Sequence, residues 1–257
     1  MKYLYKRILG AILFVSVTAS LQAENIYVTF NIKASKSANL AFTSTGIVQK
    51  VYVDVADRVK KGQKLAELVN SDLRSALLVA EENLNTTKVD LKFAKRAYLR
   101  EDKVKKLISE SQHDQVIQAY ESAKSGIAQK EANLAYQQAL LDKTVLYAPF
   151  DGVIYEKEVE VGDAVSGAMI RTVFKIQNIE KVKLILEFDQ KYWNKVKVGQ
   201  TFEYRVDGDE KKYQGKISKI YPYADSNNRK VKAEVVATGF VPGLFGDGYI
   251  LADEKKK

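Results

Sequence analysis

Two short stretches of the chain alternate apolar with polar residues, which is the two-residue period of a half-buried β-strand. The apolar positions are Val51, Val53 and Val55 in the first stretch and Val159 and Val161 in the second. Both stretches belong to a sequence repeat, in which residues 45–62 match residues 151–167 at an offset of 106 residues. Each copy holds about thirty residues, too few to bury a core alone, so we expect the two copies to face each other in a small β-sandwich. Tight turns with positive φ are expected at the glycines of the repeat: Gly46, Gly62, Gly152 and Gly162.

The residues between the two copies, 71–142, have a helical pattern. They contain no proline and one glycine, and they are rich in good helix formers. A seven-residue spacing, typical of coiled coils, runs through each half of the stretch: Leu77, Leu84, Leu91 and Tyr98 with Leu73, Ala80, Thr87 and Ala94, then Tyr120, Ile127, Leu134 and Leu141 with Val116 and Ala123. Ser109 followed by Gln112 predicts a capping box, which places the reversal of the chain near residues 107–109. We therefore predict an exposed hairpin of two coiled-coil helices, each about 35 residues and roughly 50 Å long.

Strand-like alternation returns after Val182, interrupted by turn signals at residues 198–200, 207–209 and 225–228. This spacing is typical of a small β-barrel. Residues 26–32 alternate as well, and we expect them to add a strand to the barrel from the other end of the chain. The predicted order is nested, with the barrel outside, the sandwich within it and the helical hairpin innermost.

The N-terminal residues have the order of a secretory signal peptide. Lys2, Lys6 and Arg7 precede the apolar run 8–19, and we expect cleavage after Ala23. An uncleaved membrane anchor is the alternative, although the run is shorter than the roughly 20 residues that a spanning helix needs. The absence of cysteine excludes disulfides, thiol catalysis and the lipid-bearing cysteine of an exported lipoprotein.

Charge and composition narrow the function further. The formal net charge is +9, and it falls to about +6 without the three basic residues of the signal segment. Most lysines alternate with acids, which favours a solvated surface over a nucleic-acid-binding patch. The single histidine, His113, excludes multi-histidine metal centres and most triads that need a general base, and we expect it to be solvated. No phosphate-binding loop is present, so we expect neither an enzyme nor a bound cofactor or metal.

The two half-motifs resemble a known family. Residues 46–65 form the first, and residues 144–165 form the second, in which Ala-Pro-Phe-Asp-Gly at 148–152 directly follows a coiled coil. Further matching stretches lie in the barrel segment at 198–200, 215–217, 220–222, 229–231 and 241–245. The chain is similar to the periplasmic adaptor subunits, or membrane fusion proteins (HlyD/AcrA-like family), of tripartite efflux pumps of the resistance-nodulation-division class.

The resemblance implies a mixed α and β, elongated fold, in which the coiled-coil hairpin is inserted in a split lipoyl-like β-sandwich followed by a small β-barrel. A membrane-proximal domain is expected to be absent or vestigial. The expected segments are 1–23 as signal peptide, 24–40 as a strand joining the barrel, 41–70 and 143–180 as the two lipoyl-like halves, 71–142 as the hairpin, 181–251 as the barrel and 252–257 as a charged tail.

The resemblance also implies partners and a location. The chain would be exported to the periplasm and assemble into a ring, expected to be a hexamer. It would bridge an inner-membrane transporter of the resistance-nodulation-division class and a TolC-type outer-membrane channel for the export of drugs or other small molecules. Its association with the membrane would be peripheral, through the transporter, and no nucleic acid would be involved.

The family uses an arginine, an apolar residue and a serine near the hairpin tip to engage the channel. Ser109 matches the serine, and Ile108 precedes it. Two pairs compete for the other positions: Arg100 with Val104, and Lys103 with Leu107. One departure lies elsewhere, since Ala56 stands where the family usually has glycine, and the turn there is expected to be less tight.

Three alternatives remain at this point. The split repeat also resembles biotinyl and lipoyl carrier domains of acyl-transfer enzymes, but the helical stretch occupies the place of the hairpin that would carry the modified lysine. An adaptor of an ATP-driven exporter fits the same motifs as an adaptor of a proton-driven pump. A free-standing coiled-coil scaffold is the third alternative.

Overall fold

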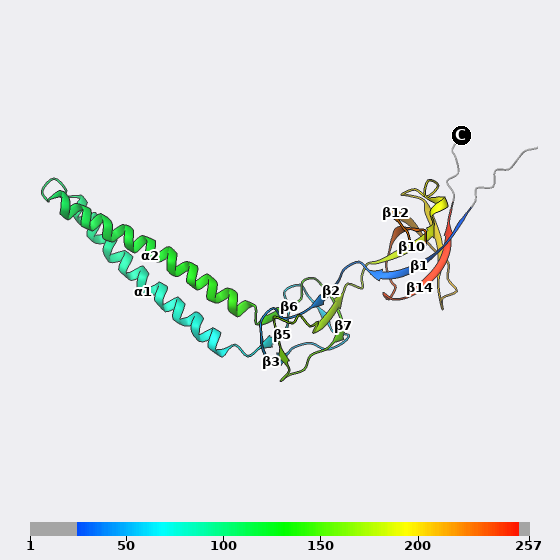
Figure 1. Cartoon of the computed structure of the whole chain (residues 1–257), viewed down its shortest axis with the longest axis horizontal. Coiled ribbons are helices and arrows are strands. Elements are labelled where there is room, and N and C mark those ends of the chain that lie inside the picture. The colour runs from blue at the N-terminus through cyan, green and yellow to red at the C-terminus, as the bar shows by residue number, and fades with distance from the viewer. Residues whose placement is uncertain (1–24, 252–257) are drawn as a thin grey trace, which may run out of the picture. The chain divides into compact units, whose positions relative to one another are not determined.

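The computed structural model describes residues 25–251, which separate into two compact units (Figure 1). One unit holds residues 34–182 and 238–242, and the other holds residues 25–33, 183–237 and 243–251. The predicted signal peptide and charged tail lie outside the described residues. Within the described part of the chain, no helix is both long and apolar enough to span a bilayer.

The unit that contains both ends of the described chain is a closed β-barrel. Its strands are, in order around the barrel, β1 (Ile26–Ala34), β10 (Val182–Asp189), β13 (Lys230–Ala237), β12 (Tyr213–Asp225), β11 (Thr201–Val206) and β14 (Phe245–Ile250). Alternate residues of β1 are buried, and the ring of Phe30 meets Phe202 and Tyr204 edge-on inside the barrel, with ring centroids 5.7 and 5.4 Å apart. The predicted barrel strand at residues 26–32 is therefore confirmed.

Eight short strands of the other unit form two four-stranded sheets. One sheet has the order β2 (Ser37–Leu40), β9 (Phe174–Gln177), β7 (Gly152–Lys157) and β4 (Arg58–Val59), and the other has the order β6 (Val145–Tyr147), β5 (Lys64–Leu68), β3 (Gly46–Val51) and β8 (Ala164–Val165). Apolar side chains from both halves of the repeat share one buried core, which includes Val48 of the first half and Ile154 of the second. Neither half encloses this core alone.

The two halves of the repeat exchange strands. β4 of the first half pairs with β7 of the second, and β8 of the second half pairs with β3 of the first. The connecting hydrogen bonds come in equivalent pairs: Ala56 N–H to Ile154 O (2.8 Å) with Gly162 N–H to Val48 O (2.9 Å), and Ile154 N–H to Asp57 O (3.0 Å) with Val48 N–H to Asp163 O (2.9 Å). Because each pair differs by the repeat offset, the sequence repeat becomes an approximate two-fold symmetry of the sandwich.

Glycine has two different roles in the repeat. Gly62 and Gly162 have φ of +80° and +96°, as expected for tight turns. Gly46 and Gly152 were also expected in turns, and this expectation is wrong, since they begin β3 and β7 and are not among the residues with positive φ. A short side chain is needed there because a neighbouring segment packs closely, above all at Gly152.

Ala56 takes the left-handed conformation of its symmetry mate Gly162, with φ of +74°. The turn is therefore the same in both halves, and a Cβ is tolerated at a steric cost of about 1–2 kcal/mol. We expect Ala56→Gly to raise the free energy of unfolding by about 0.5–1 kcal/mol, after the extra chain entropy of glycine is subtracted. Gly162→Ala should lower it by a similar amount, and urea titrations of both variants measure the difference. Equal stability of Ala56→Gly and the parent chain would contradict the strain at residue 56.

The predicted segment 24–40 is divided between the two units. β1 ends at Ala34, a bend follows, and β2 pairs with β9 in the sandwich. Ala38 and Leu40 pack against the sandwich core. Alternation continues on both sides of the bend, so the pattern does not reveal that the side chains change from one core to the other.

Two helices extend between β5 and β6, α1 (Ser71–Asp102) and α2 (Glu110–Asp142), and we call them the helix pair (Figure 1). Their limits coincide with those expected for the helical stretch. Residues on the predicted seven-residue seam are buried or half-buried, and Ala80 and Leu84 are the most enclosed. Toward the far end, the rings of Tyr98 and Tyr120 stack across the seam with centroids 5.2 Å apart.

Candidate functional site

The connection between α1 and α2, residues 103–109, closes the far end of the helix pair, and we call it the tip (Figure 1). It contains five of the six residues predicted to contact a channel: Lys103, Val104, Leu107, Ile108 and Ser109. The sixth, Arg100, lies in the last turn of α1. Leu107 is 85% exposed, and Ile108 beside it is half-buried. An apolar side chain this exposed adds little to the stability of the chain and is available to a partner.

Ser109 caps α2. Its hydroxyl accepts a hydrogen bond from Gln112 N–H, and its own N–H donates to Gln112 Oε1, both at 3.3 Å. The predicted capping box is confirmed. Of the two competing pairs, Lys103 and Leu107 both lie in the tip, whereas Arg100 points from the end of α1. Which pair contacts a partner stays a prediction.

The tip end of the helix pair is strongly basic. Residues 88–106 include eight lysines and arginines against three acids, and none of the eight forms an ion pair with another described residue. α2 has the opposite balance, with two lysines and five acids. On α1 a groove of about 330 Å³ combines cations with exposed apolar side chains, and its lining is Phe93, Arg96, Leu99, Arg100 and Lys103. This face suits a helical partner that carries carboxylates.

His113 was expected to be solvated, and the structure corrects this. The residue is half-buried, and its Nδ1 is shielded from solvent without a hydrogen-bond partner among the described residues. The reason is its position seven residues before Tyr120, which continues the seam of α2 toward the tip.

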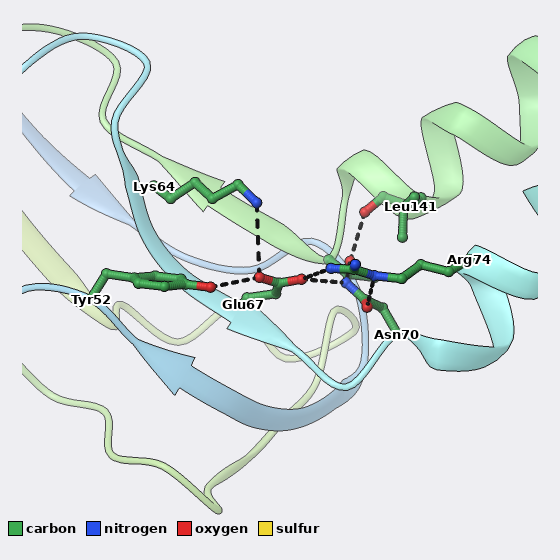
Figure 2. Close-up of polar contacts among 7 residues, drawn as sticks. Tyr52, Lys64, Glu67, Asn70, Arg74 and Leu141 are labelled. Carbon is green, nitrogen blue, oxygen red and sulfur yellow. Dashed lines mark hydrogen bonds and ion pairs between the residues drawn. The ribbon is translucent and has the colours of Figure 1, made fainter.

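A cluster of polar side chains joins the other end of the helix pair to the sandwich (Figure 2). We call it the base cluster: Tyr52, Lys64, Glu67, Asn70, Arg74 and Thr144. The carboxylate of Glu67, on β5, lies at its centre and is 3% exposed. It accepts hydrogen bonds from the hydroxyl of Tyr52 (2.8 Å) and the amide of Asn70 (3.0 Å), and it pairs with the guanidinium of Arg74.

Asn70 connects the two helices at their base. It precedes α1 but makes no side-chain cap. Its Nδ2 instead donates to Glu67 and to the hydroxyl of Thr144 (3.0 Å), and its Oδ1 accepts from Nε of Arg74 (2.8 Å). The hydroxyl of Thr144 donates to the carbonyl of Leu141 in the last turn of α2 (2.6 Å). The start of α1 and the end of α2 are thereby fixed to β5 through one buried carboxylate.

The electrostatics of the base cluster favour a charged Glu67. Burial raises the pKa of this carboxyl, but hydrogen bonds from Asn70, Tyr52 and Arg74 and the nearby charge of Lys64 outweigh burial and lower the pKa to about 2. The hydrogen bond to Glu67 in turn raises the pKa of the Tyr52 hydroxyl. A permanently ionised carboxylate therefore holds the helix pair on the sandwich at neutral pH.

Sequence reasoning missed the base cluster. Every residue of β5 after Lys64 is buried, so strand alternation, which would place Glu67 on a solvated face, does not apply. The spacing of Glu67, Asn70 and Arg74 at three and seven residues was the available signal, because it places three polar groups on one side of a strand-to-helix junction. In residues 25–251, no group of three or more acids and histidines is placed to hold a metal ion.

The Ala-Pro-Phe-Asp-Gly stretch lies where the two sheets meet. Gly62 N–H donates to the carbonyl of Ala148 (2.8 Å), and Ala148 N–H donates to the carbonyl of Gln63 (2.9 Å). The carboxylate of Asp151 accepts from Lys61 N–H at 2.7 Å. This stretch is thus a joint between the halves of one split domain. In sequence comparison, residues 36–178 match the family described as the CzcB-like, barrel-sandwich hybrid domain.

The chain belongs to this family. The match covers more than half of the chain and spans both halves of the sandwich together with the helix pair. This match confirms the resemblance to membrane fusion proteins that the split repeat predicted.

Curated relatives of this barrel-sandwich hybrid protein are longer. The cobalt-zinc-cadmium resistance protein CzcB of Cupriavidus metallidurans is 27% identical over 224 residues, which are 82% of this chain and 41% of CzcB. The multidrug resistance protein MdtA of Escherichia coli is 27% identical over 174 residues, which are 66% of this chain and 42% of MdtA. The chain therefore spans less than half the length of these two relatives.

Solved structures share the fold of the barrel-sandwich hybrid chain. The structure of MacA from Actinobacillus actinomycetemcomitans superposes with a TM-score of 0.75, covering 90% of this chain and 79% of MacA. The sequences are 21% identical. The likeness extends to the β-barrel and the two helices, so the mixed α and β architecture is confirmed.

Proposed function

We propose that this protein is a non-enzymatic periplasmic adaptor that bridges an inner-membrane transporter and a TolC-type outer-membrane channel. The observation that supports this most directly is the helix pair, which is inserted between the two halves of the sandwich and presents an exposed apolar residue at its tip. In this proposal the helix pair is a coiled-coil hairpin, and the sandwich is the lipoyl-like domain of the family. The protein acts by geometry, since it holds two membrane proteins in contact across a gap.

The base cluster supports this role. A helix pair that holds two proteins at a fixed distance needs a rigid attachment. A buried ionised carboxylate with three hydrogen-bonding partners provides one. At the other end, Leu107 supplies an apolar contact and Lys103 a charge. Docking of the tip on a channel requires a rigid attachment at the base and a tip that offers apolar and charged contacts.

The charge distribution of the helix pair supports self-association into a ring, proposed to be a hexamer. The basic, partly apolar groove of α1 is complementary to the acidic balance of α2. Contact between α1 of one copy and α2 of the next is heterologous, and such contacts close into rings when the rotation allows. The ring would then place the tips together around one channel.

The tip is tested by Leu107→Asp. Because Leu107 is almost fully exposed, the variant should unfold at the same temperature as the parent chain, within about 0.5 kcal/mol of stability. Export should be lost, because the new carboxylate has to be buried in the contact. Growth of cells in a toxic drug or metal salt that the parent protein confers resistance to measures the effect.

Two further variants frame this test. Ser109→Arg should also abolish export, but it removes the capping box and costs about 1 kcal/mol of stability, so Leu107→Asp is the cleaner variant. Gln129→Glu, which adds a carboxylate on the exposed side of α2 far from the tip and keeps every acid of α2, is the matched control and should leave resistance unchanged. Undiminished resistance in cells with Leu107→Asp would contradict the docking role of the tip.

The cargo is proposed by class only. CzcB is named for resistance to cobalt, zinc and cadmium, and MdtA for resistance to several drugs. Both names fit export across the envelope, and we propose metal cations or small drugs as the exported compounds. The transporter partner is proposed to be a proton-driven pump of the resistance-nodulation-division class, with an ATP-driven exporter as the alternative. A carrier domain is not favoured, because the helix pair occupies the position of a lysine-bearing hairpin.

A further inference from the structure

The β-barrel unit has a hollow of about 700 Å³ between β12 and the short 3-10 helix η1 (Gln190–Tyr192). Its volume lies within the roughly 300–1,000 Å³ that is typical of small-molecule pockets. None of its residues belongs to the tip or the base cluster, so the proposed function does not use it. The described residues that line it are Gln190, Lys191, Trp193, Ile220, Tyr221, Pro222, Tyr223, Ala224 and Val231.

One wall of the hollow is a bulge in β12. Along the β12–β13 ladder, Ile220 pairs with Ala233, and the next pair is Ala224 with Val231. Residues 221–223 therefore stand opposite a single residue of β13 and leave the regular ladder. The residue at the centre of the bulge is proline, which has no N–H, so the ladder loses no donor there. The bulge is thus a built feature of the strand, and it places two tyrosines on the wall of the hollow.

The other wall is η1, which is tied to the barrel by hydrogen bonds. Gln190 N–H donates to the carbonyl of Arg229 in the turn between β12 and β13 (2.9 Å), and this bond joins the two walls. Asp189 caps η1 by accepting from a backbone N–H (2.8 Å), and Val196 just beyond is 1% exposed. Both walls are therefore in place before a ligand arrives, which lowers the entropy cost of binding.

The lining is mainly apolar and aromatic, because Gln190 and Lys191 are its only two members with polar chains among the residues that also include two tyrosines. Two of its aromatic side chains are largely uncovered, since Trp193 is 69% exposed and Tyr223 is 55% exposed. Tyr221 meets Tyr223 edge-on, with ring centroids 6.5 Å apart. A flat aromatic molecule gains most from such a surface, because it stacks on the exposed ring faces and removes them from water.

The rim of the hollow carries both signs of charge. Asp189 directly precedes η1, and Asp225 is the last residue of β12. Each carboxylate accepts a hydrogen bond from a backbone N–H (2.8 and 2.9 Å) and keeps its negative charge. The ammonium of Lys191 lies 4.8 Å from the centre of the Tyr192 ring. An ionic ligand of either sign would meet a like charge as well as an opposite one and would lose hydration, whereas an uncharged ring system has neither cost.

We propose that this hollow binds an uncharged planar aromatic molecule, with its ring system stacked on Trp193 and Tyr223. The site belongs to the β-barrel unit alone, and the inference does not depend on the proposed adaptor role. It gives the protein a small-molecule ligand in addition to its proposed protein partners.

The test uses the fluorescence of Trp193, which is the only tryptophan of the chain. The probe is N-phenyl-1-naphthylamine, an uncharged aromatic molecule that accepts energy from tryptophan and emits more strongly in apolar surroundings. Titration of this probe into the purified protein should quench Trp193 in a saturable way, with one site per chain. The emission of the probe should rise over the same concentration range.

Two charged probes test whether the rim selects a sign. The anion 1-anilinonaphthalene-8-sulfonate has the same rings as the neutral probe, and proflavine is a planar aromatic cation. Neither should bind more tightly than the neutral probe, because the carboxylates and ammonium groups at the rim oppose each other.

Three variants separate this site from other apolar surfaces, and the emission of the neutral probe measures its affinity for each. Trp193→Leu and Tyr223→Ala should each weaken binding by up to about ten-fold, the value of one lost ring contact. Both side chains are more than half exposed, so neither change should unfold the barrel. Tyr249→Ala is the matched control, because Tyr249 is 48% exposed on β14, does not line the hollow and should leave binding unchanged.

Each contrary outcome overturns the proposal. Quenching that does not saturate, or affinity that falls equally in Tyr249→Ala, would show nonspecific adsorption of the probe. Tighter binding of either charged probe would show that the site selects an ion. Unchanged affinity in both Trp193→Leu and Tyr223→Ala, with far-ultraviolet circular dichroism like that of the parent, would show that the probe binds elsewhere.

Discussion

Replacing Gly152 with alanine is expected to lower the free energy of unfolding of the sandwich by about 3 kcal/mol. A Cβ at residue 152 would lie 2.6 Å from the carbonyl oxygen of Gln177 and 3.0 Å from Cγ1 of Ile176. The first of these is backbone in the neighbouring strand β9, so β7 and β9 have to move apart. Helical circular dichroism during a urea titration follows this unit, because α1 and α2 both belong to it.

The repeat provides a matched control in Gly46, which begins β3 as Gly152 begins β7. A Cβ at residue 46 would meet only the side chain of Leu68, at 3.2 Å from Cδ1, and a shift of that side chain by a few tenths of an ångström relieves the contact. Gly46→Ala should therefore cost no more than about 1 kcal/mol. Trp193 lies in the other unit and should report the same barrel transition in both variants. Equal costs for the two alanines would contradict the close approach at Gly152.

The second large effect is expected from Glu67→Gln, and it should depend on pH. The folded carboxyl has a pKa of about 2, compared with an ordinary value of 4.5. A depressed pKa contributes stability that is fully present above pH 4.5 and is lost as the pH falls toward 2. The difference corresponds to about 3 kcal/mol at neutral pH. Glu67→Gln should be less stable than the parent chain by about this amount at pH 7.

The test is a series of urea titrations between pH 7 and pH 3, followed by helical circular dichroism. The gap between Glu67→Gln and the parent chain should narrow as the parent loses its charge-dependent stability below pH 4.5. Glu131→Gln, an exposed change of the same chemistry, should run parallel to the parent at every pH. A gap that stays constant with pH would mean that Glu67 contributes through packing and not through its charge.

Much of the fold could be predicted because apolar residues recur at regular short spacings along the sequence. The seven-residue seam through Leu84 and Tyr120, the capping box at Ser109 and the two-residue period of β1 each depend on residues close in sequence. The internal repeat added one long-range fact, since Val48 and Ile154 had to occupy equivalent places in one core. Each of these signals survives folding, because tertiary contacts reinforce the local preference.

The remaining features depend on which segments meet, and no local period encodes that. Glu67 is a charged residue in a short strand, where a solvated face is the usual expectation. It is buried instead, because the ends of the two helices cover that face of β5. Residues 221–223 continue the alternation of β12, and only the pairing with β13 reveals that they bulge. Gly152 has no unusual φ, and its need for glycine comes from Gln177. Sequence alone thus located the reversal between the two helices and missed the base cluster.

The exchange of strands between the two halves of the sandwich has a consequence for how the chain matures. β4 has no partner until β7 exists, so the first half cannot complete its sheet while it is being synthesised. The helix pair lies between β4 and β7 in the chain. Where α1 and α2 pack together, the amide of Asn70 lies 3.0 Å from the hydroxyl of Thr144. If the helix pair closes first, the 74 residues between Asn70 and Thr144 no longer add to the loop that separates β4 from β7, and we expect the strands to pair faster. The helix pair, proposed to reach a channel, is thus also expected to bring the two halves of the sandwich together during folding.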